Sequence, residues 1–254
     1  MTKLIINADD FGINKDVNSA IMAAMDSNLC RDTTLLVNFE ESEHAAGLAI
    51  SSKRKNNIGI HFNLTEGYPL TSKIKNEDRF CNKEGLFHYK KDKRIFRLSN
   101  SEKIAVYEEL RSQIHLCRKF GIPVSHADSH NHIHEEPGLL FLFIEILKKE
   151  AIPFIRLSNN MGETTFINAF YRMSFNTVLR LNKLNGTDYF GSTSNLNHYK
   201  NTFNTNDVIE LMIHPGQLKN NQVIDVYSNE NLSIQLPLII REFKMMSYSE
   251  ILHK

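Results

Sequence analysis

The stretch Gly121-Ile-Pro-Val-Ser-His-Ala-Asp-Ser-His-Asn-His-Ile-His134 combines two features that decide how the chain is expected to fold. It opens with a short apolar run, residues 121–125, that reads as a buried strand. It continues with four imidazoles and one carboxylate between His126 and His134, and these groups are typical metal ligands. Reactive side chains at the end of a strand are typical of parallel α/β folds, in which the active site forms at the carboxyl edge of the sheet.

The same arrangement recurs at three other places. They are Asn7-Ala-Asp-Asp-Phe-Gly12 after the run at residues 3–6, His61 and Asn63 after Ile58-Gly-Ile60, and His214 after Leu211-Met-Ile213. Because the carboxyl ends of parallel strands meet at one edge, we expect these groups to form a single site.

Strand-like and helix-like patterns alternate along the chain. The pattern predicts strands at 4–8, 33–37, 57–62, 123–128, 153–157 and 208–214, and helices at 16–28, 41–52, 102–120, 138–151 and 232–246. Strands separated by helices indicate βαβ units and a mostly parallel sheet. About six or seven such units favour an α/β fold, a distorted or incomplete (β/α) TIM-like barrel, as a single catalytic domain over residues 1–254.

Two segments interrupt this alternation. Residues 71–103 are charged and carry Phe80, Phe87, Tyr89 and Phe96, and residues 185–206 are rich in Asn, Ser and Thr. Long loops of compact α/β domains are often lids or binding loops, and a solvated insertion without a role is equally compatible with the pattern. The chain contains no Trp, so aromatic residues of the 71–103 insertion are expected to supply any stacking surface for a sugar.

The composition restricts the partners and the compartment. A formal net charge of +1 over 254 residues gives no global field that favours nucleic acid or an anionic membrane, and neither is expected as a partner. Three cysteines without a C-x-x-C spacing favour a reducing compartment. The early acidic pair excludes a secretory leader, and the longest apolar stretch, residues 138–147, is too short to span a bilayer. We therefore expect a cytoplasmic protein.

Asp9 and Asp10 are the first candidates for chemistry. Neighbouring residues of a strand point to opposite faces, so both can serve one site only if the strand breaks at Phe11-Gly12. One carboxylate could then bind a divalent ion while the other acts on a bound water, whose pKa such an ion can lower from 15.7 to roughly 7. The alternative is that Asp-Asp-Phe-Gly caps the next helix, although Asn14 or Asp16 could cap it equally well.

The histidine cluster offers more ligands than one ion needs. If the strand stays extended, Asp128, His130, His132 and His134 share one face, and together with Asp10 and His61 they exceed a single coordination shell. Some are therefore expected to be catalytic or to orient a ligand, as Asp128 could do for one imidazole. The isolated histidines are expected to be packed or to face solvent; they are His44, His88, His115, His198 and His253.

These segments, taken together with His214-Pro-Gly216, resemble the motif set of the YdjC-like carbohydrate deacetylases, which include the chito-oligosaccharide deacetylases. The resemblance implies a metal-dependent hydrolase that removes N-acetyl groups from acetylated sugars or short oligosaccharides. It implies Asp10, His61 and His130 as metal ligands and Asp9 as the general base. His214 takes the place of a catalytic histidine, with His132 as a second candidate for the general acid.

The resemblance also implies one divalent metal ion, Mg²⁺, whereas ligand softness alone leaves Zn²⁺ and other transition metals open. The expected partner is a small acetylated carbohydrate, and a homodimer is compatible with the pattern.

Two enzyme classes compete with this interpretation. His126-Ala-Asp128 with a distant His214 spells the ligand pattern of a non-haem iron oxygenase. A metal-dependent phosphoesterase is the other alternative, and it would need a basic clamp for phosphate, for which Arg156 is the candidate near a predicted strand end. A metal-storage or sugar-binding module without activity would leave Asp9 without a role.

Overall fold

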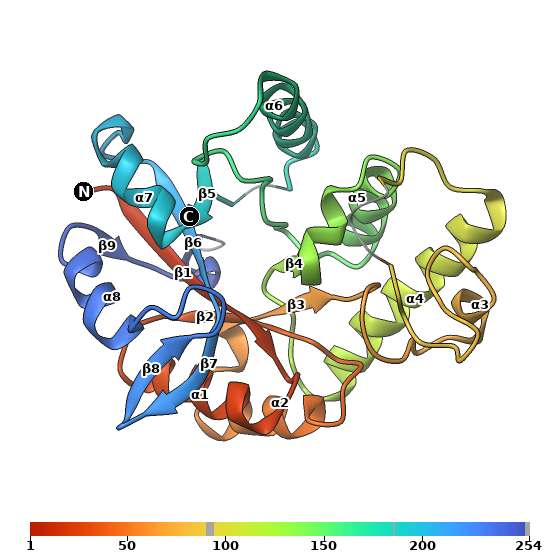
Figure 1. Cartoon of the computed structure of the whole chain (residues 1–254), viewed down its shortest axis with the longest axis horizontal. Coiled ribbons are helices and arrows are strands. Elements are labelled where there is room, and N and C mark those ends of the chain that lie inside the picture. The colour runs from red at the N-terminus through yellow and green to blue at the C-terminus, as the bar shows by residue number, and fades with distance from the viewer. Residues whose placement is uncertain (90–93, 185, 252–254) are drawn as a thin grey trace.

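A parallel sheet forms the centre of the molecule (Figure 1). The computed structural model describes residues 1–89, 94–184 and 186–251. Six strands lie in the order β4-β3-β2-β1-β6-β5, and a short strand, β9, pairs with the start of β1. Their bounds are β1 Lys3–Phe11, β2 Asp32–Leu35, β3 Ile58–Phe62, β4 Ala127–Ser129, β5 Tyr189–Ser192, β6 Val208–Ile213 and β9 Lys244–Met245. The predicted incomplete α/β barrel is confirmed.

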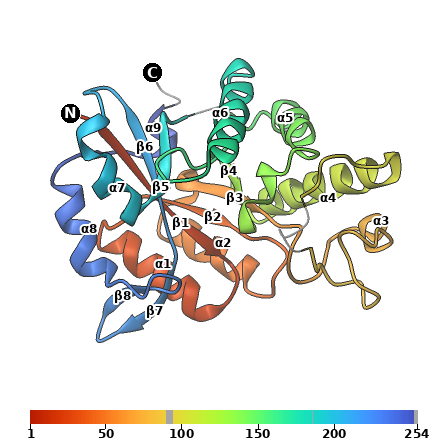
Figure 2. The same ribbon diagram turned by 45° about the horizontal axis from the view of Figure 1, so that its top comes forward.

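Helices surround this sheet. The longer ones are α1 Lys15–Asp26, α2 Ser42–Ser51, α4 Asn100–Lys119, α5 Leu140–Lys149, α6 Phe166–Leu181, α7 Thr193–Tyr199 and α8 Leu232–Ile240. The short ones are α3 Ser72–Lys75, α9 Tyr248–Ile251 and the 3-10 turns η1 Lys55–Asn57, η2 His130–Glu135 and η3 Lys200–Thr202. Helices α1 and α2 pack beside β1 and β2, whereas α4 and α5 lie toward β3 and β4 (Figures 1 and 2).

Local sequence explains where the helices begin. The Asn14 side chain accepts a hydrogen bond from the Val17 N–H and caps α1, so the alternative that Asp-Asp-Phe-Gly is the cap is wrong. Ser99 and Glu102 form a reciprocal capping box at the start of α4, which satisfies two backbone N–H groups that the helix leaves without partners.

The gap between β4 and β5 is filled by an irregular segment, residues 154–161. The strand predicted at 153–157 is wrong, because Ile155 makes only one bridge to Ala127 and its N–H donates to the carbonyl of Leu184. On the other side, the Asn160 side chain accepts from the Phe190 N–H and donates to the Asp188 carbonyl. The barrel is therefore closed on one side by a loop that is bonded to both neighbouring strands.

Three further predictions need correction. The strand expected at 123–128 begins only at Ala127, and Val124 has a left-handed φ of 60° that interrupts it. The helix expected at 232–246 ends at Ile240. The 185–206 segment, whose residue 185 lies outside the described residues, contains β5 and α7 rather than a long loop. Helix α6 and the antiparallel hairpin of β7 Pro215–Lys219 and β8 Gln222–Asp225 were not predicted.

Part of the 71–103 insertion packs into the core. Its buried side chains are Ile74, Phe80, Phe87, Tyr89, Ile95 and Leu98, and of the aromatic residues singled out from the sequence Phe96 is the exposed one. Residues 90–93 lie outside the described part of the chain. The segment is thus anchored to the core by apolar side chains, while many of its other described residues are exposed.

Cys30, Cys81 and Cys117 are buried and free. Within the described residues, none of the helices is both long enough and apolar enough to cross a membrane.

Candidate metal centre

The acidic pair sits where β1 bends. Asp10 has a left-handed φ of 69°, and the pairing of β1 with β2 shifts register between Ala8 and Phe11. Gly12 follows with φ 99°, and a Cβ there would lie 2.5 Å from the Leu36 carbonyl oxygen. The break thus falls at Asp10 itself, and both Asp9 and Asp10 reach the same site.

Asp10, His61 and His130 come together at the carboxyl edge of the sheet. His130 Nδ1 lies 2.8 Å and His61 Nε2 lies 3.2 Å from the same oxygen, Asp10 Oδ1. One donor atom from each of the three residues lies within 4.8 Å of the others, and all three side chains are buried. This is the set of residues that the sequence analysis assigned to a metal ion.

Neighbouring carboxylates orient the two imidazoles. A hydrogen bond of 2.6 Å joins His61 Nδ1 with Asp128 Oδ1, and Thr34 Oγ1 donates to the other oxygen of Asp128 over 3.0 Å. The hydrogen bond between His61 Nδ1 and Asp128 directs His61 Nε2 toward Asp10. Carboxylates commonly orient metal-binding histidines in this way. Glu66 Oε1 lies 3.4 Å from His130 Nε2.

The charges of the site are strongly coupled. Burial alone lowers the pKa of His61, but the charge of Asp128 and the hydrogen bonds with Asp10 and Asp128 outweigh it and raise the pKa to about 10. Burial likewise opposes protonation of His130, and hydrogen bonds with Asp10 and Glu66 raise its pKa to about 9. The buried acids of the site therefore favour positive charge on His61 and His130. A divalent ion bound between these residues would supply positive charge at the same position.

Arg156, which comes from the irregular segment 154–161, was considered from the sequence only as a phosphate clamp, and its contact with Asp9 was not foreseen. Its guanidinium is fully buried and binds Asp9 through two hydrogen bonds of 2.6 and 2.7 Å. It also lies 2.8 Å from Asp128 Oδ2 and donates to Glu210 Oε1 over 2.7 Å. A lone arginine inside an apolar run, Ile152 to Leu157, is the signal that could have revealed it, because a buried guanidinium requires carboxylate partners.

Asp9 is held as a carboxylate by these contacts. Burial favours its neutral form, but the charge and hydrogen bonds of Arg156 hold the pKa of Asp9 below its usual range. The Asn7 amide donates to Asp9 Oδ1 over 2.9 Å. Asp9 Oδ2 lies 3.9 Å from His214 Nε2, so the two expected catalytic residues face each other.

The Pro-Gly that follows His214 has a packing function. A Cβ at Gly216 would lie 1.7 Å from Val226 Cγ1, so a side chain there would collide with the turn after β8. The Val226 N–H donates to the His214 carbonyl over 3.0 Å. Glycine at this position therefore lets the 225–228 turn pack directly against the segment that carries His214.

The predicted common face of the histidine cluster is wrong. The strand ends at Ser129, and Asn131 and His132 adopt left-handed conformations with φ of 52° and 51°. His134 is consequently buried among apolar rings, with Phe175 at 6.0 Å and Phe143 at 6.2 Å between ring centroids. The His132 ring lies 6.0 Å from that of Phe190.

The oxygenase and phosphoesterase alternatives find no support. His126 stacks on Tyr248 at 4.1 Å, its ring nitrogens contact Ser125 and Asn7, and burial lowers its pKa to about 3. It is a packed core residue rather than a ligand. Arg156 is fully engaged by buried carboxylates and cannot clamp a phosphate.

The remaining histidines behave as expected. His44, His88, His115 and His198 are exposed, whereas His253 lies outside the described residues. Asn63 is structural, because its side-chain oxygen accepts from the N–H groups of Thr65 and Glu66 and shapes the turn that carries Glu66.

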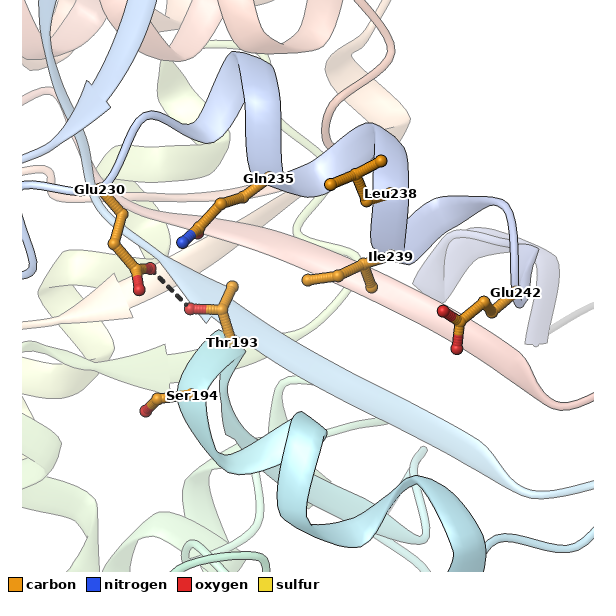
Figure 3. Close-up of a pocket in the computed structure, with 7 residues that line it drawn as sticks. All are labelled: Thr193, Ser194, Glu230, Gln235, Leu238, Ile239 and Glu242. Carbon is orange, nitrogen blue, oxygen red and sulfur yellow. Dashed lines mark hydrogen bonds between the residues drawn. The ribbon is translucent and has the colours of Figure 1, made fainter.

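Two cavities are relevant to where a substrate could bind. One of about 580 Å³ is lined by residues 65–66, 87–89 and 131–133, and it adjoins the metal centre through Glu66. The other, of about 260 Å³, lies between α7 and α8 (Figure 3). Its wall includes Thr193, whose hydroxyl donates to Glu230 over 3.0 Å, and none of the predicted site residues lines it.

Comparison with known proteins agrees with this geometry. A family model described as YdjC-like protein matches residues 3–250. The chain belongs to the YdjC-like family. Among its relatives, a carbohydrate deacetylase of Clostridium beijerinckii is 34% identical over 85% of this chain and 82% of the relative. A carbohydrate deacetylase of Vibrio cholerae is 32% identical over 84% of this chain and 78% of the relative.

A solved structure shows the same fold for this YdjC-like chain. It is a protein of Enterococcus faecalis, described as a proposed cellobiose-phosphate cleavage protein. The two chains superimpose with a TM-score of 0.75 over 98% of each, at 20% identity. At this identity the likeness supports the fold alone.

Proposed function

We propose that the protein is a metal-dependent carbohydrate deacetylase that hydrolyses the N-acetyl group of a small acetylated sugar. The observation that carries the proposal is the convergence of Asp10, His61 and His130 beside an ionised Asp9. The deacetylase names of the relatives support the same reaction.

The donor set fits a divalent ion. Two imidazoles and one carboxylate converge in a buried site, and His61 already has its second nitrogen bonded to Asp128. Asp10, His61 and His130 would hold the ion, with Mg²⁺ as the proposed metal and Zn²⁺ or another transition metal as the alternative that these ligands also suit. When bound, the ion would supply Lewis acidity toward the acetamide carbonyl and toward water.

In this proposal Asp9 accepts a proton and His214 donates one. Asp9 is positioned to accept a proton from the attacking water at Oδ2, the oxygen that faces His214. Arg156 fixes the plane of this carboxylate with two hydrogen bonds and keeps it ionised. His214 Nε2 is positioned to deliver a proton to the leaving amine, a role typically worth about 10²–10⁴-fold in rate.

Acetate release from a panel of N-acetylated hexosamines and disaccharides tests the proposed function. We expect release that stops when a chelator removes the ion and returns when a divalent metal is restored. Release that is indifferent to chelator would contradict metal dependence, and no release from any sugar of the panel would contradict the substrate class.

Replacing His130 by alanine is expected to remove most of the bound metal and to abolish acetate release, because one of the three donors is lost. Elemental analysis of the purified variant measures the metal content. His44→Ala removes an exposed histidine on α2 and serves as the control with unchanged metal. A His130→Ala protein that retains one equivalent of metal would exclude His130 as a ligand.

We also propose a homodimer formed through α6. One face of α6 packs against the protein through the buried side chains of Phe175 and Leu179. The other face exposes a stripe of large apolar side chains, each at least 60% exposed: Phe166, Ile167, Phe170, Met173 and Leu181. Such residues offer on the order of 500–800 Å², close to the roughly 800 Å² that each partner buries in a standard interface. A contiguous exposed apolar patch of this kind normally marks a protein–protein contact.

Light scattering after size exclusion tests this surface. Phe170→Asp is expected to convert a dimer into a monomer, because it places a charge in the centre of the apolar stripe. Ile104→Asp, at an exposed apolar position of α4, is the control that should stay dimeric. A wild-type monomer at tens of micromolar would exclude the proposed interface.

We place the enzyme in the cytoplasm. Three buried, free cysteines are in keeping with a reducing compartment.

A further inference from the structure

Tyr227 is an aromatic side chain left open to solvent beside the catalytic groups. It is 67% exposed, and its ring centroid lies 4.5 Å from that of His214 with an interplanar angle of 84°. Other exposed aromatic side chains in the described part of the chain make no ring contact with a residue of the centre; they are Tyr68, Phe96, Phe141, Phe166 and Phe170. Tyr227 therefore differs from these residues because its exposed ring contacts the proposed catalytic residue His214.

The backbone around Tyr227 is fixed with respect to His214. The buried Asp225 carboxylate accepts from the His214 N–H through Oδ2 at 2.7 Å. Its other oxygen accepts from the Tyr227 and Ser228 N–H groups at 3.0 Å each. One carboxylate thus ties the segment that carries His214 to the turn that carries Tyr227, and Gly216 allows the close packing of that turn. The ring is exposed without lying on a loose loop.

Tyr227 lies near the acidic residues of the metal centre. Partial burial, followed by the charges of Asp10, Glu66 and Asp9, raises the pKa of its phenol. The side chain therefore stays neutral at physiological pH, and it presents an apolar ring and a hydroxyl group beside His214 and near these acids.

We propose that Tyr227 is the platform on which the pyranose ring of the substrate stacks, and that Asp225 is a positioning residue that holds this platform beside His214. Carbohydrates present a face of C–H groups that packs on aromatic rings, and an aromatic residue with a polar tip suits a site that is apolar on one side and wet on the other. The 71–103 insertion contributes Phe87 and Tyr89 to the wall of the cavity of about 580 Å³, but these rings are largely buried, whereas Tyr227 is an open ring in contact with His214.

This inference rests on the proposed function. Steady-state acetate release from N-acetylglucosamine tests it with Tyr227→Leu, Tyr227→Phe and the exposed control Phe141→Leu. We expect KM to rise about tenfold for Tyr227→Leu, equivalent to about 1.4 kcal/mol of binding free energy, because leucine lacks the flat ring on which the sugar stacks. The kcat should fall by less than about threefold, because an interaction made equally in ground and transition states changes KM. Tyr227→Phe, which keeps the ring, and the control should keep KM within about threefold.

Saturation-transfer NMR with the same sugar separates the two proposals. Wild type that binds N-acetylglucosamine without releasing acetate would overturn the deacetylase assignment and, if Tyr227→Leu then loses the signal, support the platform. Wild type that releases acetate while Tyr227→Leu retains both KM and the NMR signal would overturn the platform alone. An unchanged KM with a large loss of kcat would also overturn it, because Tyr227 would then act on the reaction rather than on the ring.

Discussion

Asp9→Asn is expected to lower kcat for acetate release by about 10²–10⁴-fold, the usual contribution of a general base, while the bound metal stays in place. Asparagine keeps the shape of the side chain and can still accept a hydrogen bond from Arg156, but it cannot take up the proton of the attacking water. Asp10, His61 and His130 are untouched by the change. Acetate release at saturating sugar, combined with elemental analysis of the same preparation, measures both effects.

Asp16→Asn, at an exposed position in the first turn of α1, is the matched control and should keep full activity. A fully active Asp9→Asn enzyme would remove Asp9 from the reaction. Loss of metal together with activity would instead make Asp9 part of the ligand set, which its place beside His61 and Asp128 also permits geometrically.

Arg156→Met is expected to lower the free energy of unfolding by about 3–5 kcal/mol, the usual cost of removing one partner from a buried ion pair. Asp9, Asp128 and Glu210 would lose their shared cation in a region that excludes water. Burial already raises the pKa of Glu210 despite Arg156, so carboxylates in this region depend on that single guanidinium to stay ionised. Urea denaturation at neutral pH measures the loss.

Two further variants make the comparison specific. Arg156→Lys retains the charge but cannot reproduce the two-pronged contact with Asp9 together with the bond to Glu210, so an intermediate loss is expected. Arg97→Met, at an exposed position, should change stability by less than about 0.5 kcal/mol. If Arg156→Met unfolds at the same urea concentration as wild type, the buried network does not hold the barrel together.

The sequence pattern was sufficient for the parallel core and for the groups at its carboxyl edge. Strands with clear apolar runs, such as β1, β3 and β6, lie within three residues of their predicted bounds, since alternation of strand and helix is a strong local signal. The acidic pair, His61 and the histidine cluster could be grouped from the sequence, because parallel strands bring their carboxyl ends to a common edge. The choice of Asp10, His61 and His130 among them followed from the family resemblance.

Long-range effects account for the failures. The apolar run 153–157 looks like a strand, but Arg156 must reach Asp9, and that contact is invisible in a local window. His134 left the predicted face because Asn131 and His132 take left-handed conformations, which sequence alternation does not register. Helix α6 has a helical period with Arg172, Asn176 and Arg180 on one side, and this signal was not used to predict the helix from the sequence. Tyr227 gives no signal, since a lone tyrosine after a short strand resembles any surface residue.

The order of the strands has a consequence for how the chain acquires its structure during synthesis. Among the strands of this sheet β1 is synthesised first, yet it occupies the middle of the sheet, and its neighbour β6 is made about two hundred residues later. Until β6 is synthesised, β1 has no partner strand on one side. Until Arg156 is synthesised, the carboxylates of Asp9 and Asp128 lack the positive charge that neutralises them. Compact folding of the early segments is therefore disfavoured, and the growing polypeptide is expected to consolidate in one late, cooperative event rather than strand by strand.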